Sequence, residues 1–286
     1  MKNNDFTNVS FDFEALELCP LCGSEVFIPN GKIRWHDIDF WYVICPRCGL
    51  KFMNPRPTKE SYKEFYQKLF WEQKIRNLGF HQEGQMWQTR KYKWDNEKIW
   101  NPRDGKKNRM DKQREQRTQT IISAISSRLN LGENSDVLEV GCGFGVTLDK
   151  ISKRYKCRVF AIEPSLEVQK TIKEFGRIKL LGGWAEDLES LSKGDLKFDV
   201  IIFSHVLENT IDPLRIMRFA KDCLKERGVI YIQTPNLFTF DQMNPYHPYI
   251  FSSQTLKLIA QKAGLEYKRV SDSLDKMLAV LLYLSL

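Results

Sequence analysis

The chain has no run of 18 apolar residues, and its last apolar stretch, about ten residues from Met277, is too short to cross a bilayer. The first 17 residues are acidic and lack the apolar core of a secretory signal, which predicts a cytoplasmic protein. Cysteines in that compartment are reduced thiols or metal ligands. With 286 residues, 42% of them apolar, the chain can bury a core in one or two domains.

A third glycine of the dinucleotide-binding type is missing from the most informative stretch, VLEVGCGFG at residues 137–145. An apolar strand here breaks into a turn that contains Gly141, Gly143 and Gly145. Glycines let the backbone turn tightly and approach a ligand closely. Val146 stands where G-x-G-x-x-G would carry its last glycine, so no pyrophosphate site is predicted. Taken alone, the turn also suits an ordinary α/β domain.

The spacing of Glu139 and the three glycines resembles motif I, E/D-x-G-x-G-x-G, of the class I S-adenosylmethionine (SAM) methyltransferases. Two later strands end in acids in register with it, CRVFAIEPS in Glu163 and LLGGWAEDL in Asp187. The resemblance implies SAM as cofactor, with Glu163 on the ribose hydroxyls and Asp187 on the adenine amine. The expected cofactor-binding residues are Glu139, Gly141, Cys142, Gly143, Gly145, Glu163, Pro164, Trp184, Ala185, Glu186, Asp187 and Ser204.

Apolar strands and amphipathic helices alternate through the second half of the chain. The pattern predicts a buried strand leading into a helix at 198–209, and a helix stopped by Gly228 and then a strand at 218–236. It also predicts a helix capped by Gly264 within 253–270, and a last strand at 276–286. Such alternation predicts an α/β fold with a doubly wound, mostly parallel sheet covered on both faces. The resemblance makes this sheet Rossmann-like with seven strands.

Two cysteine pairs form a second strong signal, CPLCG at 19–23 and CPRCG at 45–49. Two C-x-x-C turns, each followed by glycine, have the ligand spacing of a zinc ribbon, with Cys19, Cys22, Cys45 and Cys48 as the ligands. Iron or a pair of disulfides are the alternatives. A closed four-thiolate site leaves no position for water, so the predicted zinc is structural. The other three cysteines are expected to be small buried residues.

The segment NPRPTKESYKEFYQKLFWEQ follows the cysteines, with a stop at Pro57, a cap at Thr58 and an aromatic-rich helix. The order CPxCG, CxxCGLxFxNPRP, helix and motif I resembles a bacterial methyltransferase group with an N-terminal zinc-binding region. That group includes sugar C- and O-methyltransferases of deoxysugar and surface-polysaccharide pathways. The resemblance covers most of the chain and predicts a zinc ribbon at 1–57, an aromatic helix and basic linker at 58–117, and a SAM-binding domain at 118–286.

The stretch at 74–117, outside that resemblance, holds 13 Lys or Arg against 6 Asp or Glu, and so carries almost all of the net charge of +8. Tryptophans such as Trp87 and Trp94 are interleaved with its cations. Three interpretations remain open: a solvated linker, a surface for an anionic substrate such as a nucleotide-linked sugar, or an RNA-binding segment.

Methyl transfer to a hydroxyl or a carbon acid requires a base. Only four histidines exist, and two, His205 and His247, fall at the expected carboxyl edge of the sheet. His247 matches the group's H-x-x-x-F-S pattern and is the first candidate, followed by Glu208 and His205. The group's L-E-H ends here in Asn209, which cannot act as a base at neutral pH.

The predicted acceptor is a sugar or related small metabolite, with oxygen preferred to carbon. After the strand at 198–204 the chain has FSHVLEN in place of an N/D-P-P-Y/F loop for base amines, and none of its three spare cysteines stands in that region as a nucleophile for pyrimidine carbon. An RNA methyltransferase that uses 74–117, or a non-catalytic partner subunit with the same fold, are the alternatives.

Overall fold

The computed structural model describes residues 10–35, 38–69, 80–83, 90–92, 109–174, 176–271 and 275–285. None of the helices in these ranges combines the length and the apolar character needed to cross a membrane.

The main sheet has the predicted Rossmann-like form, with seven strands in the order β10-β9-β8-β11-β12-β15-β14. The first five are mutually parallel, and β15 runs antiparallel to both of its neighbours. The strands are β8 (Asp136–Val140), β9 (Arg158–Ile162), β10 (Ile178–Gly182), β11 (Phe198–Ser204), β12 (Leu224–Pro235), β14 (Glu266–Arg269) and β15 (Met277–Tyr283). The doubly wound, mostly parallel α/β fold is therefore confirmed.

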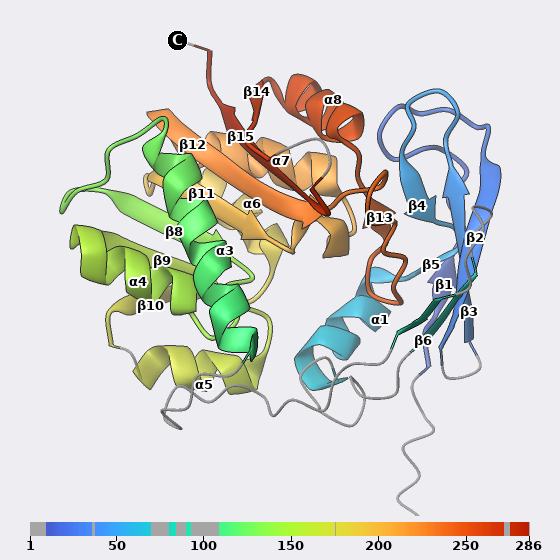
Figure 1. Cartoon of the computed structure of the whole chain (residues 1–286), viewed down its shortest axis with the longest axis horizontal. Coiled ribbons are helices and arrows are strands. Elements are labelled where there is room, and N and C mark those ends of the chain that lie inside the picture. Colours follow the sequence, from blue (N-terminus) through green and yellow to red (C-terminus); the bar gives the residue numbers. More distant parts are fainter. Residues whose placement is uncertain are drawn as a thin grey trace, which may run out of the picture.

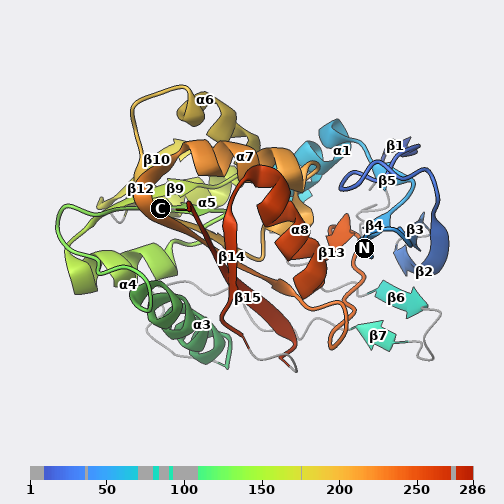
Figure 2. The same cartoon turned by 90° about the horizontal axis from the view of Figure 1, so that it is seen from above.

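Helices cover both faces of this sheet (Figure 2). One face packs against α3 (Arg109–Ser126), α4 (Val146–Tyr155) and α5 (Leu166–Glu174). The other packs against α6 (Leu188–Ser192), α7 (Pro213–Asp222) and α8 (Ser253–Ala263). Successive residues of a strand point to opposite faces, so Val137 joins the first core and Leu138 the second.

A second, antiparallel sheet lies beside the first and is built mainly from the N-terminal region (Figure 1). Its strand order is β13-β4-β3-β2-β6-β7, and a separate pair, β1 (Phe13–Glu14) and β5 (Arg56–Pro57), flanks it. The six strands are β2 (Ile28–Trp35), β3 (Ile38–Ile44), β4 (Lys51–Met53), β6 (Phe80–Glu83), β7 (Arg90–Tyr92) and β13 (Tyr249–Ile250). Because β13 pairs with β4, this sheet joins the two halves of the chain.

Parts of the predicted basic linker are strands. β6 pairs with β2, and β7 pairs with β6. The rest of the stretch between β7 and α3, with Trp94 and Trp100, lies outside the described residues, as does Trp87. The charge interpretation of this stretch therefore stays a prediction.

The aromatic helix is confirmed as α1 (Lys59–Glu64), which continues into η1 (Phe65–Leu69). The Thr58 hydroxyl accepts a hydrogen bond from the Ser61 N–H, as expected of a helix cap. The helix lies between the two sheets (Figure 1), and Tyr62 and Tyr66 are buried there.

One predicted boundary is wrong. Helix α7 ends at Asp222, and Gly228 lies inside β12 instead of stopping the helix. A Cβ at Gly228 would stand 2.8 Å from the Phe198 carbonyl oxygen. Glycine at this position therefore allows β12 to pass close to the end of β11, and this contact cannot be predicted from the local sequence pattern.

Candidate functional site

The glycine turn between β8 and α4 is as tight as its sequence predicts. Gly141, Gly143 and Gly145 have φ angles of 66°, 53° and 71°. A side chain at Gly141 would collide with Val206, and one at Gly145 would come within 2.8 Å of Ile178. Only glycine fits this backbone without strain.

Glu163, at the end of β9, ties this turn to the neighbouring strand. Its Oε2 accepts a hydrogen bond from the Gly143 N–H at 2.9 Å, and its Oε1 accepts one from the Ser165 N–H at 3.0 Å. Glu163 is 3% exposed and lines a cavity. Each carboxylate oxygen can accept a second hydrogen bond from a group in that cavity.

Asp187 closes the next turn along the sheet edge. Its Oδ2 accepts hydrogen bonds from the Gly183 N–H at 2.7 Å and the Trp184 N–H at 2.9 Å. Asp187 is not among the cavity-lining residues, whereas Trp184, Ala185 and Glu186 are. Asp187 thus holds the backbone of Trp184 in place. Both of these hydrogen bonds go to Oδ2, and neither goes to Oδ1.

Glu139, at the end of β8, is buried, and burial raises its pKa to about 8. Its Oε2 has no hydrogen-bond partner among the described residues. A buried carboxylate oxygen without a partner is costly unless a ligand or water satisfies it. Arg117 of α3 attracts Glu139 electrostatically. The sequence analysis did not single out Arg117, because it is one of many lysines and arginines in the stretch at 74–117 and no local pattern distinguishes it.

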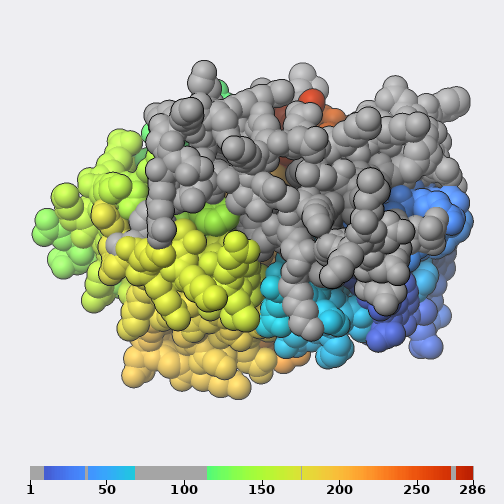
Figure 3. Space-filling model, turned by 90° about the horizontal axis from the view of Figure 1, so that it is seen from below, coloured from blue at the N-terminus to red at the C-terminus, as the bar shows by residue number. Residues whose placement is uncertain are grey.

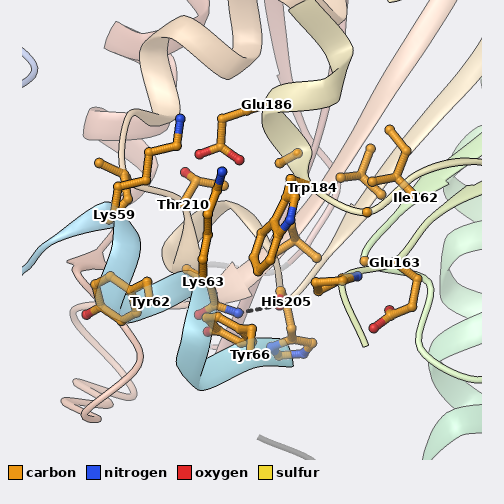
Figure 4. A pocket seen from close by; sticks show the side chains of 18 residues that line it. Lys59, Tyr62, Lys63, Tyr66, Ile162, Glu163, Trp184, Glu186, His205 and Thr210 are labelled. Carbon is orange, nitrogen blue, oxygen red and sulfur yellow. Dashed lines mark hydrogen bonds between the residues drawn. The ribbon is translucent and has the colours of Figure 1, made fainter. Parts of the chain in front are cut away.

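The cavity is open to solvent. Figure 4 shows Glu163, Trp184 and His205 on the sheet side and the side chains of α1 and η1 on the other. Those residues are Lys59, Tyr62 and Lys63 of α1 and Tyr66 of η1. The Lys63 ammonium lies 5.7 Å from the centre of the Trp184 ring. No sequence signal placed this helix at the site, since the contact depends on how the two sheets pack.

The three candidate catalytic groups cluster, and only one of them faces the cavity. His205 lines it, with its side chain 25% exposed, and has a left-handed φ of 59°. Its Nδ1 lies 3.3 Å from Oε1 of the fully buried Glu208. Backbone strain of this kind is typical of functional positions.

Glu208 lies between two histidines. Burial alone would raise its pKa, but His205 lowers it below the ordinary value. His247 is 6% exposed, its Nδ1 lies 3.3 Å from the Gln242 carbonyl oxygen, and burial lowers its pKa to about 4. His247 is not among the cavity-lining residues.

Five other expected cofactor residues are also not among the cavity-lining residues: Glu139, Cys142, Gly143, Gly145 and Ser204. The Ser204 hydroxyl donates to Gln233 Oε1 at 3.5 Å, and Cys142 Sγ lies 3.4 Å from the Gly143 carbonyl oxygen. Neither lines the cavity. Asn209 does line it, and its side-chain amide donates to the His205 carbonyl at 2.9 Å.

The four cysteines of the N-terminal region converge as predicted. Their sulfur atoms all lie within 4.8 Å of one another, and Cys19–Cys48 and Cys22–Cys45 are 3.6 Å and 3.5 Å apart. Tetrahedral zinc with bonds of about 2.3 Å would separate its sulfurs by roughly 3.8 Å. All four are free thiols in the structure, and their arrangement fits one metal ion.

Part of this chain is similar in sequence to known proteins. A probable S-adenosylmethionine-dependent methyltransferase of Mycobacterium tuberculosis (strain H37Rv) is 27% identical over 135 residues, 45% of this chain and 48% of that protein. The ubiquinone biosynthesis O-methyltransferase of Pasteurella multocida is 31% identical over 134 residues, 40% of this chain and 52% of that protein. The chain therefore matches only about half the length of these curated relatives.

A solved structure shows the same fold. The plantazolicin methyltransferase BamL superposes with a TM-score of 0.50 at 15% identity, over 59% of this chain and 86% of that one. The family model described as a methyltransferase domain matches residues 110–270, from the start of α3 to the end of β14. Because this match covers more than half of the chain, the protein belongs to the methyltransferase-domain family.

Proposed function

We propose that this protein transfers a methyl group from SAM to a hydroxylated small metabolite, a sugar or nucleotide-linked sugar. The observation that carries the proposal is Glu163, which holds the glycine turn closed while facing the cavity. A dinucleotide site would need a turn that cradles phosphate, and Val146 occupies the position of its third glycine. The proposal therefore names SAM, which has no phosphate.

The residues around the cavity fit SAM chemically. Glu163 can accept hydrogen bonds from the two ribose hydroxyls, and Trp184 and Ala185 offer an apolar surface for the adenine. Glu139 does not line the cavity, but its Oε2 lacks a partner among the described residues and suits the ammonium group of the methionine part if SAM reaches it. When bound, SAM supplies an electrophilic methyl group on a sulfonium. The protein then has to hold an acceptor in line and remove its proton.

His205 is the proposed base, because it lines the cavity and its Nδ1 faces Glu208 at 3.3 Å. The buried carboxylate orients the ring and stabilises the imidazolium that forms after proton transfer. His247 is buried and, with its pKa lowered to about 4, is neutral near pH 7, so it is not proposed as the base. The order of the proposed catalytic residues thus becomes His205, Glu208 and His247.

The proposed sugar acceptor rests on the resemblance of the N-terminal motifs, and α1 supports an anionic one. Lys59 and Lys63 are half-buried in the cavity wall, and neither forms an ion pair with a described carboxylate. Two such ammonium groups suit the phosphates of a nucleotide-linked sugar. The four cysteines are proposed to hold a structural Zn²⁺.

Calorimetry with S-adenosylhomocysteine, the demethylated cofactor, tests the proposal. We expect binding to the zinc-loaded protein and a loss of about tenfold or more in Glu163→Gln, because a charge-assisted acceptor contributes about 1.5–3 kcal/mol. Glu167→Gln, on the exposed face of α5, is the matched control and should keep wild-type affinity. Absence of binding to folded, metal-loaded wild-type protein would overturn the proposed function.

A further inference from the structure

Segment 244–248, Asn-Pro-Tyr-His-Pro, is held by the N-terminal region through its backbone. Each of its five carbonyl oxygens lies within hydrogen-bond distance of a donor from residues 42–66. The contacts are Tyr42 hydroxyl to Asn244 at 2.8 Å and to His247 at 2.7 Å, Tyr62 hydroxyl to Pro245 at 3.3 Å, Tyr66 hydroxyl to Tyr246 at 3.2 Å, and Met53 N–H to Pro248 at 2.8 Å.

The composition of the segment explains why it needs these donors. Pro245 and Pro248 have no N–H, so the segment cannot continue a helix or a strand ladder by itself. Its carbonyl groups are buried, and buried carbonyls without a partner are costly. Tyr42 also accepts a hydrogen bond from the Asn244 N–H at 3.2 Å, so one hydroxyl contacts the segment three times.

The three phenols are buried donors that stay protonated. Tyr42 is 1% exposed, and burial raises the pKa of all three hydroxyls above the ordinary value. The rings of Tyr62 and Tyr66 line the cavity, while their hydroxyls bind the segment that carries His247. The same side chains therefore shape the cavity and fix the segment behind it.

Two of the contacts flank one cysteine pair directly. Tyr42 lies on β3, three residues before Cys45, and Met53 lies on β4, five residues after Cys48. Between them, Lys51 forms an ion pair of 2.7 Å with Asp241, just before the segment. The turn that carries Cys45 and Cys48 thus sets the position of both strands that bind the segment.

We propose that Tyr42, Tyr62 and Tyr66 are positioning residues for segment 244–248, and that metal binding at the four cysteines holds this clamp in place. The metal site then controls the acceptor side of the cavity, although no cysteine lines it. Naming that side rests on the proposed function, whereas the contacts themselves do not.

Hydrogen exchange followed by mass spectrometry on the full chain tests the clamp. Tyr42→Phe, and chelation of the zinc-loaded protein, should each speed exchange of the amides at 244, 246 and 247 by about tenfold or more, as expected for a lost buried hydrogen bond. The glycine turn at 141–145 should keep its protection. Tyr267→Phe is the matched control, because its hydroxyl bonds to Ser253 at 2.6 Å away from the segment.

A second readout separates positioning from general destabilisation. The side-chain ¹⁵N signals of His247, assigned with His247→Gln, should shift in Tyr42→Phe and not in Tyr267→Phe, while both variants bind S-adenosylhomocysteine within about twofold of wild type. If Tyr42→Phe does not fold, Tyr62→Phe and Tyr66→Phe each remove one contact and serve instead in the exchange and ¹⁵N measurements, without the cofactor-binding comparison, because their rings line the cavity. Wild-type protection of the segment in folded clamp variants or in the chelated protein would overturn the inference. Failure of cofactor binding in the wild type would instead overturn only the proposed function.

Discussion

Three carboxylates stand at the same edge of the main sheet, and their surroundings give them different states. Glu163 accepts two backbone N–H bonds, Glu208 faces His205, and Glu139 is buried with one oxygen unsatisfied. Burial therefore raises the pKa of Glu139 to about 8, while His205 lowers that of Glu208. The sequence predicts which acids reach this edge, but their ionisation depends on partners from distant segments.

His247 makes stability depend on pH. Burial lowers its pKa to about 4, whereas the unfolded chain has an ordinary value near 6.5, so the unfolded state binds the proton more tightly. The stabilisation is complete above the unfolded pKa and is lost as the pH falls toward the folded pKa. Between pH 7 and pH 5 we expect His247 to remove about 2 kcal/mol of unfolding free energy.

Urea unfolding at both pH values, in wild type and His247→Gln, measures this contribution. Only the difference between the two pH-dependent losses belongs to His247, because thiols and carboxylates titrate in both proteins. Equal losses would show that His247 is not held neutral by burial.

Among elements, those with local signals could be predicted from the sequence. The strand and turn at 137–145, the Thr58 cap and the cysteine turns were all predicted, because glycine conformation, capping and ligand spacing act within a few residues. The placement of α1 against the cavity and of Gly228 inside β12 could not be predicted. Both depend on packing between segments far apart in the chain.

The glycine turn between β8 and α4 should tolerate no side chain. Gly141→Ala adds a Cβ at a φ of 66° and drives it into Val206, so we expect unfolding free energy to fall by about 2 kcal/mol. Gly132→Ala is the control, because a Cβ there meets no atom within 4 Å, and its effect should stay within about 0.5 kcal/mol. Urea titration of both variants gives the comparison. Equal stability of the two would mean that the turn is not tightly packed.

At the scale of the molecule, the N-terminal region and the methyltransferase domain share packing. One apolar core contains Cys45, Leu50 and Phe52 together with Tyr249 and Phe251. Figure 3 shows the cyan segment of α1 directly against the yellow part of the main domain. The division of the chain at 57 and 117 stays a prediction from the sequence motifs, and the β4–β13 pairing crosses it.

The Lys51–Asp241 ion pair joins these two parts, although its residues lie 190 positions apart in the sequence. Lys51 is fully buried, its ammonium lies 5.7 Å from the centre of the Tyr42 ring, and burial lowers its pKa, an effect that Asp241 partly offsets. Removing the acid leaves a buried cation without its main partner, whereas removing the lysine leaves an acid that solvent can reach, since Asp241 is 35% exposed.

Asp241→Asn should therefore lower the unfolding free energy by about 3 kcal/mol, and Lys51→Met, of similar volume, by about 1 kcal/mol or less. Urea unfolding of the zinc-loaded variants measures both. The double variant should be more stable than Asp241→Asn alone, because it no longer buries an unpaired charge. If Lys51→Met were the more damaging change, the pair itself would be stabilising, and contact between the two parts would depend on the charge more than on the shared apolar core.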